Sequence, residues 1–101
     1  APVSVVITVD RELANDTIAH FDCGAATYGL VLAAWSKGLG TVINGQGIMQ
    51  SSVVRENANI PADQVIMTCV AMGYPDEEFV ANHVQSRRAT DGAVASFVGF
   101  A

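Results

Sequence analysis

Basic residues are scarce in this sequence. Only five of its 101 residues are Lys or Arg, against ten Asp or Glu, so the formal net charge is −5 at pH 7. Binding to nucleic acid or to an anionic membrane surface requires clustered positive charge. The composition therefore argues against both kinds of partner.

Long apolar runs are absent as well. The longest, YGLVLAAW at residues 28–35, is far shorter than the roughly 20 residues of a membrane-spanning helix. The opening APVSVVITVD has neither the basic start nor the cleavage site of a signal peptide. We therefore expect no membrane partner. Because the chain enters a strand directly and has no initiator Met, we also expect it to be part of a longer protein.

Cysteine is rare, with one residue (Cys23) in an apolar helical stretch and the other (Cys69) in an apolar strand-like stretch. This placement favours buried, reduced thiols and hence a cytoplasmic protein. A disulfide is the less favoured alternative, and no spacing typical of a metal site occurs. Either thiol could in principle act as a nucleophile with His20 or His83 as base, but nothing in the local sequence supports that pairing.

Apolar residues, in contrast, make up half of the chain, and the mean hydropathy is +0.34. Apolar runs at 3–9, 65–73 and 93–101 predict three strands, the last of them a strand-like tail. The stretch DCGAATYGLVLAAWSKG is apolar on every helical face, which predicts a buried helix. Gly38 fits the left-handed position that ends such a helix.

Shorter helices are predicted over 11–20, from Ser51 or Ser52 to Asn57, and from Asp76 onward. This order of elements predicts an α+β (mixed α/β) fold. Three apolar strands and one wholly apolar helix present more apolar surface than 101 residues can bury alone.

Four glycines lie in KGLGTVINGQG, residues 37–47. A dinucleotide fingerprint fails here, because the segment follows a helix and Ile43 occupies the third glycine position. A phosphate-binding loop fails too, because Gln46 and Gly47 stand where Lys and Ser or Thr are needed. A helix stop followed by tight turns is the simpler interpretation, and we expect a loop here.

The second half of the chain has one acidic cluster and one basic cluster. The acidic run at 76–78 is explained by a helix N-terminus, which favours negative charge. Arg87 and Arg88 are adjacent in an otherwise acidic chain. They could be a solvated loop, or they could bind a phosphate, for which arginine is well suited. Together with the glycine segment, they would supply what flavin mononucleotide (FMN) needs, namely amides for its ring edge and a cation for its phosphate.

The order of motifs is more specific than any one of them. GAATYGLVLAAWSKGLGT is followed by VVRENANIPADQVIMTCVAMGYPDEE, then by the arginine pair and FVGF. This order resembles the C-terminal half of the FMN-dependent nitroreductase family, over nearly the whole chain. The resemblance implies a mixed sheet flanked by helices. It makes residues 1–101 the C-terminal part of a single domain whose N-terminal half is absent, with the tail 93–101 pairing with a partner subunit.

The resemblance also implies a cofactor site. Main-chain groups of Ile43, Asn44, Gly45 and Gln46 would face the flavin ring, and Arg88 would bind the FMN phosphate, with Arg87 as the alternative if the loop shifts by one residue. Thr90 stands where the family has proline, a departure from its R-x-P pattern.

The activity implied by the resemblance is that of an oxidoreductase. NAD(P)H would deliver hydride to flavin N5, and a nitroaromatic, a quinone or a similar acceptor would take it in ping-pong turnover. The protein would be a homodimer with FMN at the interface, and no side chain need act as a nucleophile. The alternatives are a non-catalytic dimerising or partner-binding domain, and another flavin chemistry on the same fold.

Overall fold

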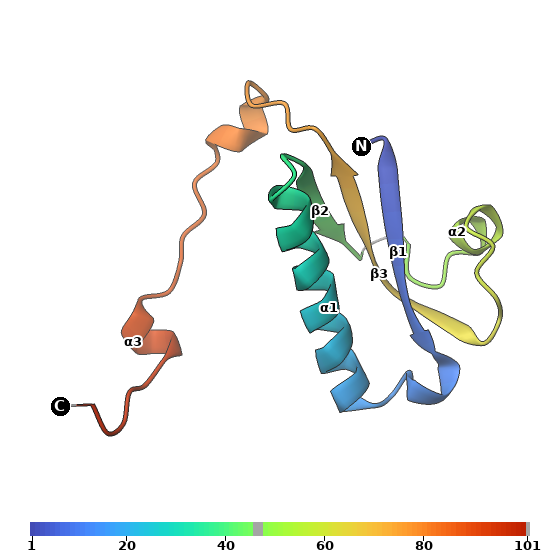
Figure 1. Ribbon diagram of the computed structural model, residues 1–101, viewed down its shortest axis with the longest axis horizontal. Helices are drawn as coiled ribbons and strands as arrows, with labels where there is room; N and C mark the ends of the chain where they lie inside the picture. The colour runs from blue at the N-terminus through green and yellow to red at the C-terminus, as the bar shows by residue number, and fades with distance from the viewer. Residues whose placement is uncertain (46–47, 101) are drawn as a thin grey trace.

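The computed structural model describes residues 1–45 and 48–100. Its centre is a sheet of three strands in the order β1-β3-β2, with β3 antiparallel to both neighbours (Figure 1). The strands are β1 (Val3–Asp10), β2 (Gly40–Asn44) and β3 (Gln64–Gly73). The apolar runs predicted as strands at 3–9 and 65–73 are thus confirmed as β1 and β3.

The central strand carries the core. Val70 lies between Val5 of β1 and Ile43 of β2, and both Val70 and Ile66 are completely buried. A bulge between Ile7 and Thr8 shifts the β1 register. A strand with neighbours on both edges is the one most removed from water, so the longest apolar strand segment falls there.

Helix α1 (Thr17–Trp35) packs against the sheet, and its buried residues are Thr27 and Ala34. The Asp16 carboxylate caps it by accepting the N–H groups of Ile18 and Ala19. At its far end Gly38 has the predicted left-handed backbone, with a φ of 75°.

Two expectations about this region are wrong in part. The helix expected over 11–20 is a 3-10 turn, η1 (Arg11–Leu13), followed by the first turn of α1. We also expected α1 to be buried on every face, and within this chain it is not. Its outward face is exposed, because one three-stranded sheet covers only one side of a helix. The large exposed side chains are Ile18, Phe21, Tyr28, Leu32 and Trp35.

Helix α2 (Ser52–Asn57) begins as predicted, because the Ser51 hydroxyl accepts the N–H of Val54. The loop that follows it lines an open cavity together with Ser4 and Val6 of β1. Strand β2, however, replaces part of the loop expected over 37–47. Its Thr-Val-Ile core favours a strand once β3 offers an edge, and Thr41 and Val42 pair with Met72 and Ala71.

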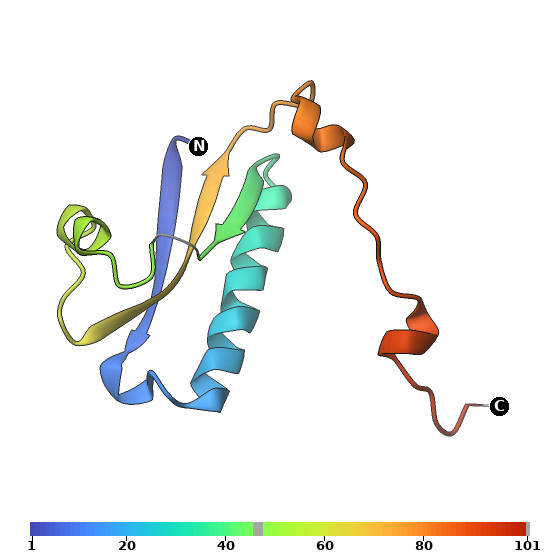
Figure 2. The same ribbon diagram turned by 180° about the vertical axis from the view of Figure 1, so that it is seen from behind.

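Residues 74–100 form an arm that leaves the body of the molecule (Figures 1 and 2). The radius of gyration is 17.0 Å, whereas a compact chain of this length has about 13 Å. The arm contains η2 (Val80–His83) and a helical turn, α3 (Asp91–Val94). Within the described residues no helix is long and apolar enough to cross a membrane.

The arm departs from two predictions. The helix expected from Asp76 does not start there, because the Asp76 carboxylate caps a turn by accepting the Glu78 N–H, and 3-10 structure starts at Val80. The strand expected over 93–101 is not formed by the described part of the chain, since this arm reaches no sheet edge. Pairing of the tail with a partner subunit stays a prediction.

Candidate functional site

The end of β2 is the candidate for contact with a planar ligand. Ile43 and Asn44 are its last two residues, both exposed, and the half-buried Gly45 follows. Gln46, predicted with them, lies outside the described residues. Among the strands described, β2 is at the sheet edge, so every second residue directs its N–H and C=O away from β3. Main-chain donors and acceptors are therefore available there.

Gly45 leaves space in front of its main chain. A Cβ added to it would meet no described atom within 4 Å. An aromatic ring could thus approach the peptide groups closely, which a side chain at this position would hinder.

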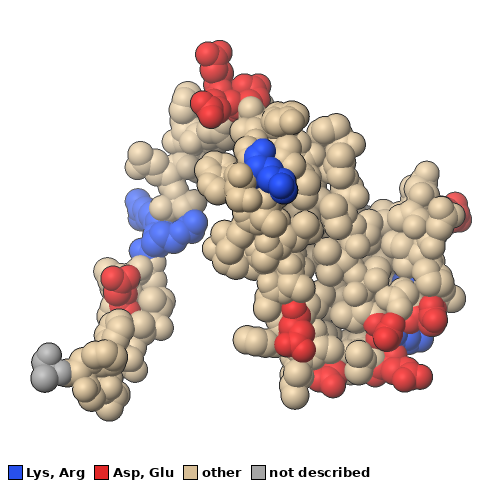
Figure 3. Space-filling view, in the orientation of Figure 1, with Lys and Arg blue, Asp and Glu red and all other residues tan. Residues whose placement is uncertain are grey.

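The arginine pair lies elsewhere. Arg87 and Arg88 are exposed between η2 and α3, and Figure 3 shows positive charge on the arm. The single chain therefore does not bring the two parts of the predicted site together.

The other two arginines are already engaged. Arg11 donates to the carbonyl of Ala62, and Arg55 donates to the carbonyl of Pro61 at 3.1 Å. Within the described residues, Arg87 and Arg88 of the arm make no such hydrogen bond to the body. Their exposed guanidinium groups are therefore the better candidates for binding an anion.

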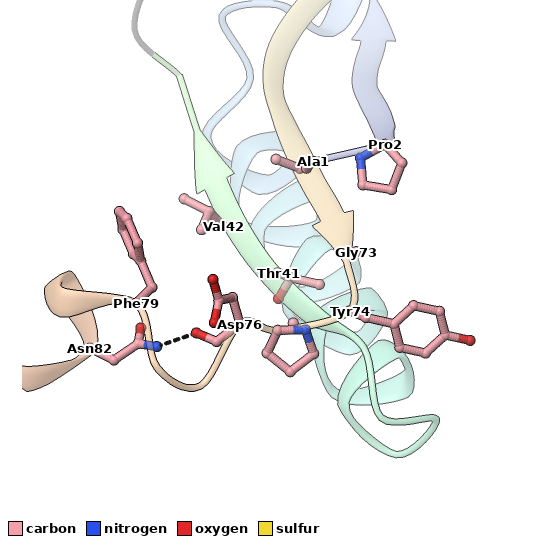
Figure 4. Close-up of a pocket in the computed structure, with 12 residues that line it drawn as sticks. Ala1, Pro2, Thr41, Val42, Gly73, Tyr74, Asp76, Phe79 and Asn82 are labelled. Carbon is pink, nitrogen blue, oxygen red and sulfur yellow. Dashed lines mark hydrogen bonds between the residues drawn. The ribbon is translucent and has the colours of Figure 1, made fainter.

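A cleft of about 500 Å³ lies at the opposite end of β2, where the arm begins (Figure 4). Its walls include Thr41, Val42, Phe79 and Asn82, whose amide donates to the Asp76 carbonyl at 2.7 Å. No Lys or Arg is among its lining residues, so it lacks a counter-charge for a phosphate. Sequence reasoning missed this cleft.

Two glycines shape that cleft. Gly40 and Gly73 face each other in register, and each lies under a proline. A Cβ on Gly40 would lie 3.4 Å from Pro75, and a Cβ on Gly73 would lie 2.7 Å from Pro2. In the sequence, the Gly-Tyr-Pro run at the end of β3 indicates a turn at this place, but it does not indicate the cleft.

The thiols and imidazoles do not form a nucleophilic pair. Cys69 is buried in β3 and Cys23 is half-buried in α1, and both are free thiols. The ring Nε2 of His20 lies 2.7 Å from the carbonyl of Ala14, and His83 lies on the arm. Over residues 1–45 and 48–100, no group of three or more His, Cys, Asp or Glu side chains could hold a metal ion.

The family of the chain follows from comparison with known proteins. The model of the nitroreductase family matches residues 1–74. The chain belongs to the nitroreductase family. This confirms the resemblance inferred from the order of motifs.

Several characterised family members are similar over almost the whole chain. A chloronitrobenzene nitroreductase of Comamonas testosteroni is 31% identical over 99 residues, which cover 97% of this chain and 42% of that protein. A nitrobenzene nitroreductase of Ectopseudomonas oleovorans is 33% identical over 83% of this chain and 36% of its own length. The chain thus spans about two fifths of the length of these relatives.

Solved structures agree on the fold. The crystal structure of a mutant of an FMN- and NADPH-dependent nitroreductase from Sphigopyxis sp. strain HMH superposes with a TM-score of 0.83 and 25% identity. The match covers 99% of this chain and 46% of that one. An FMN-dependent nitroreductase from Clostridium difficile gives a TM-score of 0.66 at 23% identity, over 99% of this chain and 59% of its own. The predicted α+β, nitroreductase-like fold is confirmed.

Proposed function

We propose that the intact protein is an FMN-dependent, NAD(P)H-using oxidoreductase that reduces nitroaromatics, quinones or similar acceptors. The observation that carries this proposal is the family match across residues 1–74. Relatives named as nitrobenzene and chloronitrobenzene nitroreductases support the substrate class. The structural neighbour described as FMN- and NADPH-dependent supports the cofactor and the electron donor.

The residues present fit one part of an FMN site. The open main chain at Gly45 and the edge of β2 at Ile43 and Asn44 suit the ring, and we assign Gln46 to the same stretch from the sequence. Arg88, or Arg87 one residue earlier, supplies the cation for the phosphate. When bound there, FMN would supply the redox chemistry, namely hydride transfer from NAD(P)H to the acceptor in ping-pong turnover.

The role of this chain is then to bind and orient. Peptide N–H groups at the end of β2 hold the polar edge of the ring in a fixed direction, and Gly45 admits the ring without a side chain in the way. No carboxylate, thiol or imidazole of this chain has to react, which agrees with the engaged His20 and the buried Cys69.

The single chain leaves this site incomplete, and the exposed apolar surface suggests what completes it. Trp35 and Phe21 on α1 are 71% and 76% exposed, and the arm exposes Phe97 and Phe100. Exposed apolar area on this scale marks surfaces that other protein covers. We propose that the N-terminal half of the protein and a second subunit cover it, and that FMN lies at the interface of the homodimer.

Spectroscopy and titration of the intact protein test this function. We expect flavin absorbance from the purified protein or after addition of FMN, and oxidation of NADH or NADPH that depends on a nitroaromatic acceptor. A protein that stays colourless with added FMN would refute the proposal. If that protein still dimerises, it would support the alternative of a non-catalytic dimerising domain.

A matched pair of variants tests the phosphate ligand. Arg88→Ala should weaken FMN binding by about 1.5–3 kcal/mol, the value of a hydrogen bond to a charged group. Arg87→Ala should leave the dissociation constant close to that of the wild type. The opposite ranking would move the phosphate contact to Arg87.

A further inference from the structure

The outward face of α1 carries apolar side chains in a regular order. Successive members are three and four residues apart in strict alternation, and every one of them is exposed. We call this set the α1 seam, and its members are Ile18, Phe21, Ala25, Tyr28, Leu32 and Trp35. Apolar residues at this spacing form the contact line between two helices that lie side by side, as in a coiled coil. The α1 seam therefore fits a second helix.

That second helix has to be long. From Ile18 to Trp35 the α1 seam runs about 26 Å, at 1.5 Å per residue. Among the helices that the structure describes, α1 has 19 residues, whereas α2, the next longest, has 6. The partner of the α1 seam is therefore either α1 of a second copy or a helix outside residues 1–101.

The α1 seam is complementary to itself when a second copy runs antiparallel to the first. In a pair centred on the middle of the seam, each residue lies level with a different residue of the other copy. The levels are Ile18 with Trp35, Phe21 with Leu32, and Ala25 with Tyr28. Each level joins a larger side chain to a smaller one, so the levels fill evenly. A contact between identical copies requires such self-complementarity, because every contact occurs twice about the symmetry axis.

Two glycines lie beside the middle of the α1 seam. Gly24 and Gly29 come level with each other in the antiparallel pair, and open space lies where a Cβ on either would be. The distance between packed helices depends on the side chains at the contact. The helices can therefore approach closely at the level where Tyr28 packs over Ala25.

The charges at the two ends of the α1 seam also match. Asp16 and Lys37 are exposed just before and just after α1, and no Lys or Arg lies between them. In the antiparallel pair, Lys37 of one copy comes level with Asp16 of the other, so opposite charges meet at both ends. A parallel pair would bring like charges together and would set Trp35 against Trp35. Charge complementarity thus selects the antiparallel order.

The exposed area suffices for a pair of copies. Phe21, Tyr28 and Trp35 are 76%, 60% and 71% exposed. Aromatic side chains bury about 150–250 Å² each, so the exposed parts of these three give roughly 400 Å² per copy. Ile18 and Leu32, also exposed, add to this area. Two copies together therefore supply roughly the 1,000 Å² that a specific interface needs.

We propose that α1 pairs with α1 of a second copy, in antiparallel order, along the α1 seam. This inference rests on the homodimer of the proposed function and on none of its flavin chemistry. The helix then lies between the sheet of its own chain and the same helix of the partner. Its apolar composition on every face follows from these two contacts.

An exchange of charges in the intact protein tests the pairing. Phe21→Glu and Leu32→Arg each place an unpaired charge in the α1 seam, and each should weaken dimerisation at least about 100-fold in sedimentation equilibrium. The double variant sets the new carboxylate of one copy against the new guanidinium of the other. It should dimerise at least about tenfold more tightly than either single variant. The two positions are about three turns apart, too far to pair within one helix.

Mixing the single variants gives a second measurement. Chains with Phe21→Glu and chains with Leu32→Arg should form heterodimers, because one level then holds an ion pair and the other keeps Phe21 against Leu32. Val53→Glu is the matched control, since Val53 is 65% exposed on α2, outside the α1 seam. Its dimer dissociation constant should stay within about twofold of the wild type.

The outcomes are distinguishable. Single variants that dimerise like the wild type overturn the pairing, because the α1 seam then faces another part of the same protein. Additive losses in the double variant, or an equal loss with Val53→Glu, also overturn it. A wild-type monomer that binds FMN overturns the pairing and leaves the flavin chemistry standing. A dimer with the expected rescue but without FMN affinity supports the pairing and overturns the flavin chemistry.

Discussion

Replacement of Gly73 by alanine tests how the arm leaves the sheet. A Cβ at this position would lie 2.7 Å from Cδ and 3.4 Å from Cγ of Pro2. Carbon atoms pack best at about 3.5–4.0 Å, so Pro2 or the end of β3 has to move by most of an ångström. The proline ring is closed onto its own backbone and cannot rotate away as a flexible side chain could.

The expected magnitude is the balance of two terms. Overpacking of this kind costs about 1–3 kcal/mol. Alanine in a strand recovers about 0.5–1 kcal/mol relative to glycine, because the unfolded chain loses freedom. The net loss lies between zero and about 2.5 kcal/mol, and mid-range values of the two terms give a loss of about 1 kcal/mol in the free energy of unfolding of Gly73→Ala.

The residue opposite in the sheet provides the control. A Cβ on Gly40 would lie 3.4 Å from Pro75, close to ordinary contact, so Gly40→Ala should keep the gain of about 0.5–1 kcal/mol that alanine has over glycine in a strand and should not lower the free energy of unfolding. Urea unfolding of both variants of the intact protein measures the difference. Pro2→Ala should rescue Gly73→Ala in a double-mutant cycle. Equal stability of the two glycine variants would refute the packing of Pro2 over Gly73.

Three further predictions concern stability and are checked by urea unfolding of the intact protein. Asp16→Ala removes the cap that accepts from Ile18 and Ala19 and should cost about 1 kcal/mol, whereas Asp16→Asn should cost little; equal losses would contradict the capping role. Gly38→Ala should cost about 1–2 kcal/mol from its left-handed φ alone, because open space surrounds it among the described atoms; no loss would contradict that backbone. Ile66→Ala should cost about 2–5 kcal/mol and Ile66→Val about 0.5–1.5 kcal/mol, and equal costs would contradict its full burial.

The parts of the fold that the sequence predicted are those with local causes. The helix stop at Gly38 follows from glycine chemistry, and the start of α2 follows from the Ser51 hydroxyl. Strand β3 was recognisable because an apolar, β-branched run of this length needs burial on both faces. In each case the residues within one turn or one strand decide the outcome.

Strand β2 shows where local reasoning fails. Glycines at both ends of Thr41–Val42–Ile43 made the segment look like turns, yet the edge of β3 turns it into a strand. That edge comes from residues 64–73, far along the chain, and no pattern within 37–47 reveals it. The same is true of Gln50, which has a left-handed backbone with a φ of 57° and a side chain that donates to the Ile66 carbonyl of β3 and accepts from Arg55 of α2.

The candidate site was predicted less completely than the fold. Ile43, Asn44 and Gly45 came from a family resemblance, and the structure adds that Ile43 and Asn44 end an edge strand and that Gly45 follows it. The role of Arg87 and Arg88 also came from the resemblance, and the described chain does not bring them to β2. Spacing along the sequence does not give the distance in space between two such segments.

The arm connects these observations. Its apolar tail has the composition of a strand, but a strand forms only where another strand offers hydrogen bonds, and within the described residues the tail pairs with none of β1, β2 and β3. The side chains of Phe97, Val98 and Phe100 are therefore exposed, and together with the outer face of α1 they account for the high mean hydropathy. Apolar area of this kind is costly in water, at about 25 cal/mol per Å². Exposed apolar surface of this kind is what other protein covers, and under the proposed function these are the surfaces at which the flavin site would be completed.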